Sequence, residues 1–365
     1  MSKRLFSVIA SLALVVAACG GAASDQTTTT SGADDPTTTL AANVPDGQLL
    51  SYSLEAGSQY QYEVDLVQHI EMSATGQGAA LDEEDLPGEA VIDVSGTAVF
   101  TNTVTDGPDP GTYAVTITGE FTDMAISGTV DGESIDSEGE IPDMADLAGL
   151  EAIEVTVIVD EQGNLVPDQE ALEDPLGGLM GDLGGLGTTP APGMDPGQFV
   201  GTAFSDQEVT VGDSWSDEIV TPGMGDEPIV TTFTNTVAGL DQVDGVEVYV
   251  IETQTSTSSI EIDLAEFFIG LMTAFGTPEG EDAAEFEAML EEIKLLISID
   301  AADSDSVTYF DATAGVARKY TLIASTHMIM DMNVPDETTG EFSGFTLDMT
   351  IDQDIEYRLI SGPAA

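Results

Sequence analysis

Apolar and polar residues alternate strictly over long stretches of this chain. A period of two is typical of antiparallel β-strands that bury one face and expose the other. Two of these stretches, residues 60–72 and 345–359, contain 13 and 15 residues, against about 5–6 in an average strand. We therefore predict a mainly-β protein with a large curved antiparallel sheet. The apolar positions are Tyr60, Tyr62, Val64, Leu66, Ile70 and Met72; Tyr113, Val115, Ile117 and Phe121; Tyr320, Leu322, Met328, Met330 and Met332; and Phe345, Leu347, Met349, Ile351, Ile355, Tyr357 and Leu359.

One region departs from this alternation. Residues 264–275 and 281–296 have the apolar spacing of helices, and Gly276-Thr277-Pro278 separates them. We predict a short helical insert at about residues 264–296. Its second helix would bury Ala284, Phe286, Met289, Leu290 and Ile293.

An internal repeat organises the β-rich part. The pentapeptide Phe-Thr-Asn-Thr-Val occurs at residues 100–104 and again, 133 residues later, at 233–237. Three further landmarks keep the same order, and an exact match of five residues is then difficult to attribute to chance. These landmarks pair Tyr113, Val115 and Ile117 with Val246, Val248 and Val250; Gly57 to Tyr60 with Gly212 to Trp215; and Val159-Asp160 and Gly163 with Phe310-Asp311 and Gly315.

The repeat predicts two related β-units, residues 47–167 and 199–361. A Gly-, Leu- and Pro-rich connection, residues 168–198, joins them. The alternative is that hairpins in a β-rich chain simply resemble one another. The pattern leaves open whether the two units form one sheet or two domains.

The N-terminus has the layout of a secretory signal peptide over residues 1–18. Lys3 and Arg4 precede an apolar run that is too short to span a bilayer, which needs about 20 residues. The sequence Val16-Ala17-Ala18-Cys19-Gly20 resembles the lipobox of bacterial lipoproteins. That resemblance implies a diacylglycerol, and with it palmitate-type acyl chains, on Cys19, which becomes the mature N-terminus. The alternative is an ordinary signal peptide with a chance cysteine.

Residues 19–46 then form a Thr-rich tether. Polar residues with Gly and Pro bury too little surface to fold. A Thr-rich spacer behind a lipidated cysteine resembles actinobacterial lipoproteins. We expect the folded part to be held off the outer face of the cell membrane. Cys19 is the only cysteine of the chain, so no intramolecular disulfide is possible.

Charge excludes several classes of partner. The 365 residues include 6 basic and 68 acidic ones, a formal net charge of −62. Removal of residues 1–18 leaves 4 basic and 68 acidic residues, hence −64. Such a body repels nucleic acid and anionic lipid surfaces, so only the covalent lipid would keep it at the membrane. The acid excess resembles that of halophilic or marine bacterial proteins.

Two acidic segments are candidate calcium loops. Residues 82–85 are Asp-Glu-Glu-Asp, and residues 303–305 are Asp-Ser-Asp. Neither has the central glycine and distal glutamate of a regular calcium loop. We favour solvated acidic surface and predict no metal site.

Catalytic patterns are weak throughout the sequence. His69 and His327 are the only histidines, and both fall on the polar phase of a strand. We find no Gly-x-Ser-x-Gly elbow and no Gly-x-Gly-x-x-Gly loop. We therefore expect no enzyme activity, no catalytic residues and no cofactor. A secreted hydrolase, the least favoured alternative, would need one histidine buried beside a serine and an aspartate.

The remaining motifs resemble a set of uncharacterised β-rich bacterial lipoproteins. Residues 209–215 and 310–315 carry this likeness, and both are interpreted as turns, with Trp215 entering a strand as a core anchor. More distantly, the architecture is similar to Lol-type and mycobacterial lipid-carrying lipoproteins, in which a curved sheet wraps helices around an apolar groove.

That likeness implies a lipid or another hydrophobic ligand. Met328, Met330, Met332 and Met349 would be either ordinary core or the adaptable lining of such a groove. A structural module that contacts cell-wall polymer or another envelope protein is the alternative function.

Overall fold

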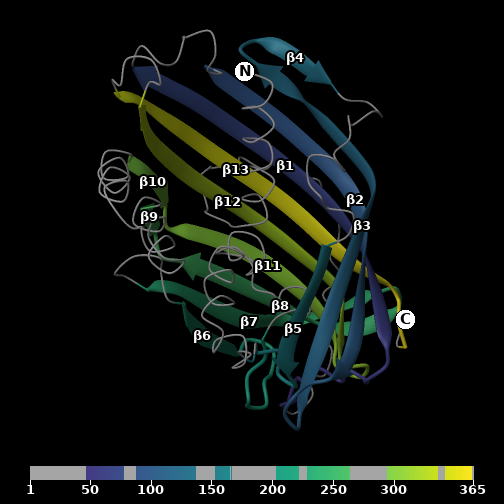
Figure 1. Cartoon of the computed structure of the whole chain (residues 1–365). Coiled ribbons are helices and arrows are strands. Elements are labelled where there is room, and N and C mark those ends of the chain that lie inside the picture. Colours follow the sequence, from purple (N-terminus) through teal and green to yellow (C-terminus); the bar gives the residue numbers. More distant parts are fainter. Residues whose placement is uncertain are drawn as a thin grey trace, which may run out of the picture.

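The computed structural model describes residues 47–77, 88–136, 153–164, 166, 203–221, 228–263, 294–335 and 342–363. Within these ranges every regular element is a strand, and all the strands belong to one antiparallel sheet (Figure 1). The predicted mainly-β fold with a large curved sheet is confirmed. The strands are β1 (Gln59–Gln77), β2 (Glu89–Asp106), β3 (Thr112–Val130), β4 (Glu133–Asp136), β5 (Ile153–Asp160), β6 (Ser214–Thr221), β7 (Ile229–Val243), β8 (Val246–Thr257), β9 (Ile260–Asp263), β10 (Lys294–Ile299), β11 (Ala302–Asp311), β12 (Val316–Pro335) and β13 (Phe342–Ser361).

The predicted helical insert is wrong at its C-terminal end. Residues 294–296 belong to strand β10, which pairs with both β12 and β9. A short apolar run does not distinguish helix from strand by its spacing alone, and two neighbouring strands supply the backbone hydrogen bonds here. The rest of the predicted insert lies outside the described residues.

The order of strands in the sheet is β4-β3-β2-β1-β13-β12-β11-β8-β7-β6. Strand β5 pairs with β3 beyond the end of β4, and β10 pairs with β12 beyond the end of β11. Strands β8 and β9 thus form one long interrupted strand, and β10 and β11 form another. The two interruptions lie side by side in the sheet. The first unit meets the second through β1 and β13, so the described strands of both units form a single sheet.

The two units have the same order of pairing. Strands β1, β2, β3 and β5 follow one another in the first unit, as β6, β7, β8 and β11 do in the second. The turn before the first strand of each unit brackets the last residue of the repeated pentapeptide. Gly57 N donates to Val104 O at 2.8 Å and Val104 N to Ser58 O at 3.0 Å, and Gly212 N donates to Val237 O at 2.8 Å and Val237 N to Asp213 O at 3.0 Å.

The third strands of the two units, β3 and β8, align differently in the structure than in the sequence repeat. Val104 pairs with Val115 in the first unit, but Val237 pairs with Ile251 in the second. The structural equivalent of Val115 is thus Ile251, which lies three residues beyond Val248, its match in the sequence repeat. The cause is local, because the second hairpin turns tightly at Asp244-Gly245 and carries a bulge after Val237.

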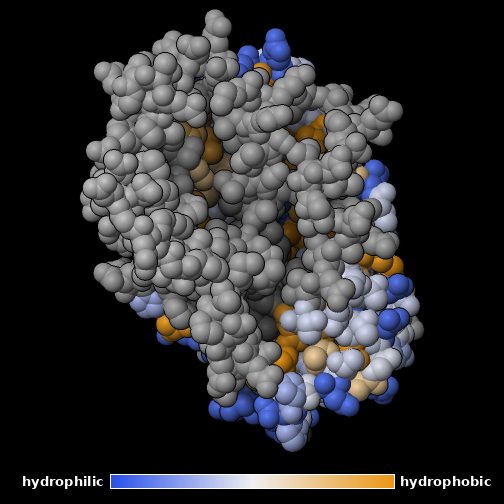
Figure 2. All heavy atoms as spheres, viewed as in Figure 1, coloured by the Kyte–Doolittle hydropathy of each residue, from blue (hydrophilic) through white to orange (hydrophobic). Residues whose placement is uncertain are grey.

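Alternation along the strands separates a buried face from an exposed face. The predicted apolar phases of β1, β12 and β13 are buried or half-buried at every position whose side chain is described. The polar phases face solvent. Apolar residues appear in orange in the hollow of the sheet, whereas hydrophilic residues gather at its margins (Figure 2). The side chains of Phe121 and Met332 are outside the described set.

Two hydrophobic clusters divide the buried face. The first, here called the aromatic cluster, joins strands of both units and includes loop residues. Only the concave side of one curved sheet allows such contacts, so the buried face is the concave one. The aromatic cluster contains Leu50, Tyr52, Leu54, Tyr60, Val64, Ala98, Phe100, Val104, Val115, Ile117, Val157, Val159, Phe204, Val209, Val237, Tyr249, Ile251, Phe310, Val316, Tyr320, Leu322, Ala324, Ile355 and Leu359.

The second cluster, here called the methionine cluster, lies farther along the same face. Its described members all come from strands. They are Ile70, Met72, Ala74, Ala90, Ile92, Val94, Ile260, Ile297, Met328, Met330, Phe345, Leu347, Met349 and Ile351.

Candidate functional site

Three methionines form a row across the centre of the sheet. Met349 on β13 pairs with Met72 on β1 and with Met328 on β12. All three are at most 5% exposed. Because paired residues on one face lie about 4.5–5.5 Å apart, the three thioethers form a continuous strip. Met330 extends it toward β10, where it pairs with Ile297.

The strip is chemically distinct from the aromatic cluster. Methionine is unbranched and polarisable, so it adapts to irregular apolar shapes and repacks easily. No methionine occurs among the buried members of the aromatic cluster. The adaptable side chains are thus confined to one part of the concave face.

Buried uncharged polar residues lie between the two clusters and beside them, and they are here called the polar belt. One row of cross-strand pairs runs from Gln68 through Gln353, Ala324 and Ser304 to Thr255. Ile70 and Ile351 lie on its methionine side, and Leu66 and Ile355 on its aromatic side. The polar belt consists of Gln68, Asn235, Thr253, Thr255, Thr257, Ser304, Ser306, Thr308, Thr326 and Gln353, all of them buried.

Gln353 differs from the polar-belt residues whose hydrogen-bond partners are known. Thr253 Oγ1 donates to Asn235 Oδ1 at 2.6 Å, which satisfies a buried pair. Gln353 is only 4% exposed, yet its Oε1 receives no hydrogen bond from any described residue. Buried polar atoms are normally paired, so an orphaned acceptor needs an explanation.

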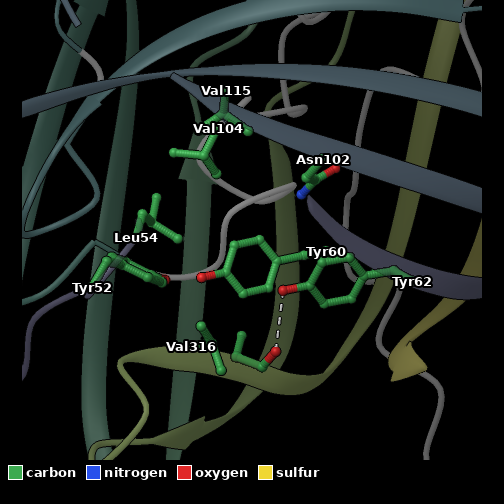
Figure 3. A pocket seen from close by; sticks show the side chains of 9 residues that line it. Tyr52, Leu54, Tyr60, Tyr62, Asn102, Val104, Val115 and Val316 are labelled. Atoms are coloured by element: carbon green, nitrogen blue, oxygen red, sulfur yellow. Dashed lines mark hydrogen bonds between the residues drawn. The ribbon is translucent and has the colours of Figure 1, made fainter. Parts of the chain in front are cut away.

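A small cavity lies on the aromatic side. Tyr52, Tyr60 and Tyr62 line it together with Leu54, Asn102, Val104, Val115, Val316 and Ala317 (Figure 3). Tyr62 Oη donates to Ala317 O at 3.3 Å, and burial raises the pKa of Tyr62. The cavity measures about 10 Å³, about the room that one water molecule needs. It is too small for an organic ligand.

Both histidines lie on the exposed face, each between carboxylates. His69 Nδ1 is 2.7 Å from Asp93 Oδ1, and its Nε2 is 3.4 Å from Glu71 Oε1. These contacts, that with Asp93 first, raise the pKa of His69. A hydrolytic triad needs a serine hydroxyl at one ring nitrogen, but carboxylates hold both positions here.

His327 has the same environment. Its Nδ1 is 2.6 Å from Asp300 Oδ2, and its Nε2 is 3.0 Å from Asp348 Oδ1. The hydrogen bond with Asp300 is the largest cause of its raised pKa, and that with Asp348 adds to it. Asp300 is one of the two residues between β10 and β11, so this histidine lies where the long strand is interrupted.

Some of the remaining predicted features lie within the described residues and others lie outside them. Residues 303–305, one candidate calcium loop, lie within strand β11, and the other, residues 82–85, lies outside the described residues. Among the described residues no group of His, Cys, Asp and Glu could hold a metal ion. Cys19 is also outside them, so its lipidation stays a prediction. The described ranges contain no helix with the length and hydropathy to cross a membrane.

Comparisons with known proteins give only remote likenesses. No protein-family model matches the chain, and no curated protein sequence is similar to it. A structure titled "lipid-protein interactions in lipovitellin" has 11% identity and a TM-score of 0.32, covering 85% of this chain and 26% of that one. OccK7 (OpdD) of Pseudomonas aeruginosa has 8% identity and a TM-score of 0.20, covering 84% and 100%. This chain thus spans about a quarter of the lipovitellin chain, and with such scores neither likeness supports a function.

Proposed function

We propose that this protein is an exported lipoprotein, anchored through Cys19 at the outer face of the cell membrane, that binds the acyl chain of a lipid. The binding surface is the methionine cluster. It holds the ligand and catalyses no reaction on it. The row of Met72, Met349 and Met328 on the concave face is the observation on which the proposal rests.

The shape of the methionine cluster suits an acyl chain. Along β13 it extends from Phe345 to Ile351, which corresponds to about 20 Å of extended strand. One leaflet of a bilayer contributes roughly 15 Å of hydrocarbon. A single acyl chain therefore matches the length of the methionine cluster along β13, and burial of each CH₂ group contributes about 0.8 kcal/mol.

The contrast with the aromatic cluster supports this location. Loop residues such as Leu50, Tyr52 and Phe204 complete the packing of the aromatic cluster. The described part of the methionine cluster comes from strands alone. Flexible thioethers on a rigid sheet adapt to chains of different length, as expected of a surface that binds lipids.

Binding is tested on the chain from residue 19 onward, with Cys19→Ser so that it carries no lipid of its own. Native mass spectrometry after gentle purification should show co-purified lipid. The delipidated protein should bind the apolar dye Nile red, and monoolein should displace it. Met330→Gln should weaken dye binding at least tenfold, because it places an amide in the apolar strip.

Two control substitutions lie on the same strand, β12. Ile323→Gln changes a residue that is 63% exposed and should leave dye affinity unchanged. Leu322→Ala removes a buried residue of the aromatic cluster, so it should lower stability without changing the affinity of the folded fraction. A protein that carries no lipid and binds no dye would overturn the proposal and favour a structural or interaction module.

A further inference from the structure

We infer that the ligand is a neutral lipid whose head group donates a hydrogen bond to Gln353 Oε1, while its acyl chain lies on the methionine cluster. This inference rests on the proposed function and names the class of ligand. The orphaned acceptor and the methionine row belong to the same strand, β13, and face the same side.

The position of Gln353 defines where the head group would lie. Residue 353 follows Ile351 on the buried phase of β13, at the border between the methionine cluster and the polar belt. Its cross-strand neighbours are Gln68 on β1 and Ala324 on β12, and the methyl group of Ala324 has no hydrogen-bond donor to offer the amide. An acyl chain that lies along β13 over Phe345 to Ile351 therefore ends beside Gln353.

The chemistry of the polar belt selects a neutral head group. Its members are amides and hydroxyls, without a charged side chain. Among the described side chains no basic group is available to an anionic head group, since all three pair with carboxylates elsewhere. Arg318 pairs with Asp311 at 2.9 Å, and Lys319 and Arg358 pair with Glu356 at 2.7 and 2.9 Å. The net charge of −62 also opposes an anionic ligand.

The acceptor itself requires a donor. A carbonyl oxygen of an amide accepts hydrogen bonds and donates none. Hydroxyl or N–H groups on the head group meet this requirement, whereas an ester without a free hydroxyl does not. The site should therefore discriminate between lipids that share one acyl chain and differ only in donors.

Monoolein and methyl oleate provide that comparison, because both are neutral and carry the same acyl chain. Their affinities are measured by displacement of Nile red from the chain that carries Cys19→Ser. Monoolein should bind about tenfold more tightly, the effect of one hydrogen bond to a buried acceptor. Gln353→Met keeps the shape of the side chain and removes the acceptor, so it should abolish this preference and leave methyl oleate binding unchanged.

Two further measurements make the test specific. Thermal unfolding of ligand-free Gln353→Met should show no loss of stability, because the lost acceptor has no internal partner. Asp354→Asn, the next residue on the opposite face, should retain the preference for monoolein. Oleate, which shares the acyl chain but is anionic, should bind more weakly than monoolein.

The outcomes separate this inference from the proposed function. If neither lipid displaces the dye, the proposed function fails. Equal displacement by both lipids, or a preference that survives Gln353→Met, overturns the inference and leaves the proposed function standing. A marked destabilisation by Gln353→Met would show that Oε1 already has a partner within the protein, and that result also overturns the inference.

Discussion

The aromatic cluster and the methionine cluster share one face of one sheet, but they are packed in different ways. In the aromatic cluster the rings of Tyr52, Phe204 and Phe310 lie 4.4–5.4 Å apart and join both units. In the methionine cluster flexible side chains lie in a row on neighbouring strands. Aromatic and β-branched residues have few rotamers, whereas methionine has many. We therefore expect the aromatic cluster to be the more rigid region and the methionine row to be the more adaptable one.

Removal of the ring of Phe310 should have the largest effect on stability. This residue is fully buried between Tyr52 and Phe204. Phe310→Ala should lower the free energy of unfolding by about 3–5 kcal/mol, since the neighbouring rings cannot collapse into the space. Urea unfolding measures this. Phe345→Ala, the matched change in the methionine cluster, should cost less, about 2 kcal/mol, because its neighbours repack. Equal costs would remove the distinction between the clusters.

The turn after β11 should be the next most sensitive site. Asp311 Oδ1 accepts hydrogen bonds from Thr313 N and Ala314 N, and its Oδ2 accepts one from Arg318 Nε. Both charged side chains are at most 12% exposed. Asp311→Ala should lower the free energy of unfolding by about 3 kcal/mol, because the buried Arg318 loses its ion pair and the turn loses two hydrogen bonds.

Asp160 provides the matched control for this change. It occupies the equivalent turn of the first unit and accepts hydrogen bonds from Gln162 N and Asn164 N at 2.9 Å. No buried arginine is among its known partners, so Asp160→Ala should cost only about 1 kcal/mol. Urea unfolding of both variants checks the difference. A loss at Asp160 as large as that at Asp311 would show that the backbone turn, and not the ion pair, is what matters.

Much of this architecture could be predicted from the sequence because it is local. Alternation needs only neighbouring residues, and the buried phase of β13 follows the predicted positions from Phe345 to Leu359. The repeat also uses short segments, so the turns at Gly57 and Gly212 were recognisable. The pairing of β1 with β13 joins residues from opposite ends of the folded chain, and no local pattern specifies such a pair.

The polar belt could not be predicted from the sequence, although a signal for it is present. Gln68 and Gln353 interrupt apolar phases, Gln68 between Leu66 and Ile70 and Gln353 between Ile351 and Ile355. A polar residue on a buried phase was the available signal. Its meaning depends on register, since only the pairing of β1, β13 and β12 aligns these positions in one row.

Conservative changes within the methionine row should have a smaller effect. Met328→Leu combined with Met349→Leu conserves volume and should lower the free energy of unfolding by about 1 kcal/mol. Affinity for monoolein should fall only a few-fold, because the strip stays apolar but loses adaptability. Urea unfolding and dye displacement measure the two effects. Phe310→Leu, a comparable change in the aromatic cluster, should cost more than this pair, and the opposite order would contradict the assignment of the rigid region.

The smallest expected effect concerns pH at the interrupted strand. Asp300 and Asp348 raise the pKa of His327 above its usual value of about 6.5. The protonated ring therefore stabilises the fold fully below that value, and this contribution disappears as pH rises through the folded-state pKa. Since about a third of the side chain is exposed, solvent screening limits it to about 0.5 kcal/mol.

The change that isolates this effect is His327→Asn, with His69→Asn as its control. Between pH 6 and pH 8 the parent should lose more stability than His327→Asn. The protection of the β10 amides from hydrogen exchange, relative to the intrinsic exchange rate at each pH, should also fall as pH rises in the parent, because Asp300 and His327 join the end of β10 to β12. His69 contacts Asp93 and Glu71 on β2 and β1, so His69→Asn should leave exchange in β10 unchanged. If both substitutions alter β10 equally, the pH response belongs to the overall acidic charge of the protein and not to the boundary between its rigid and adaptable regions.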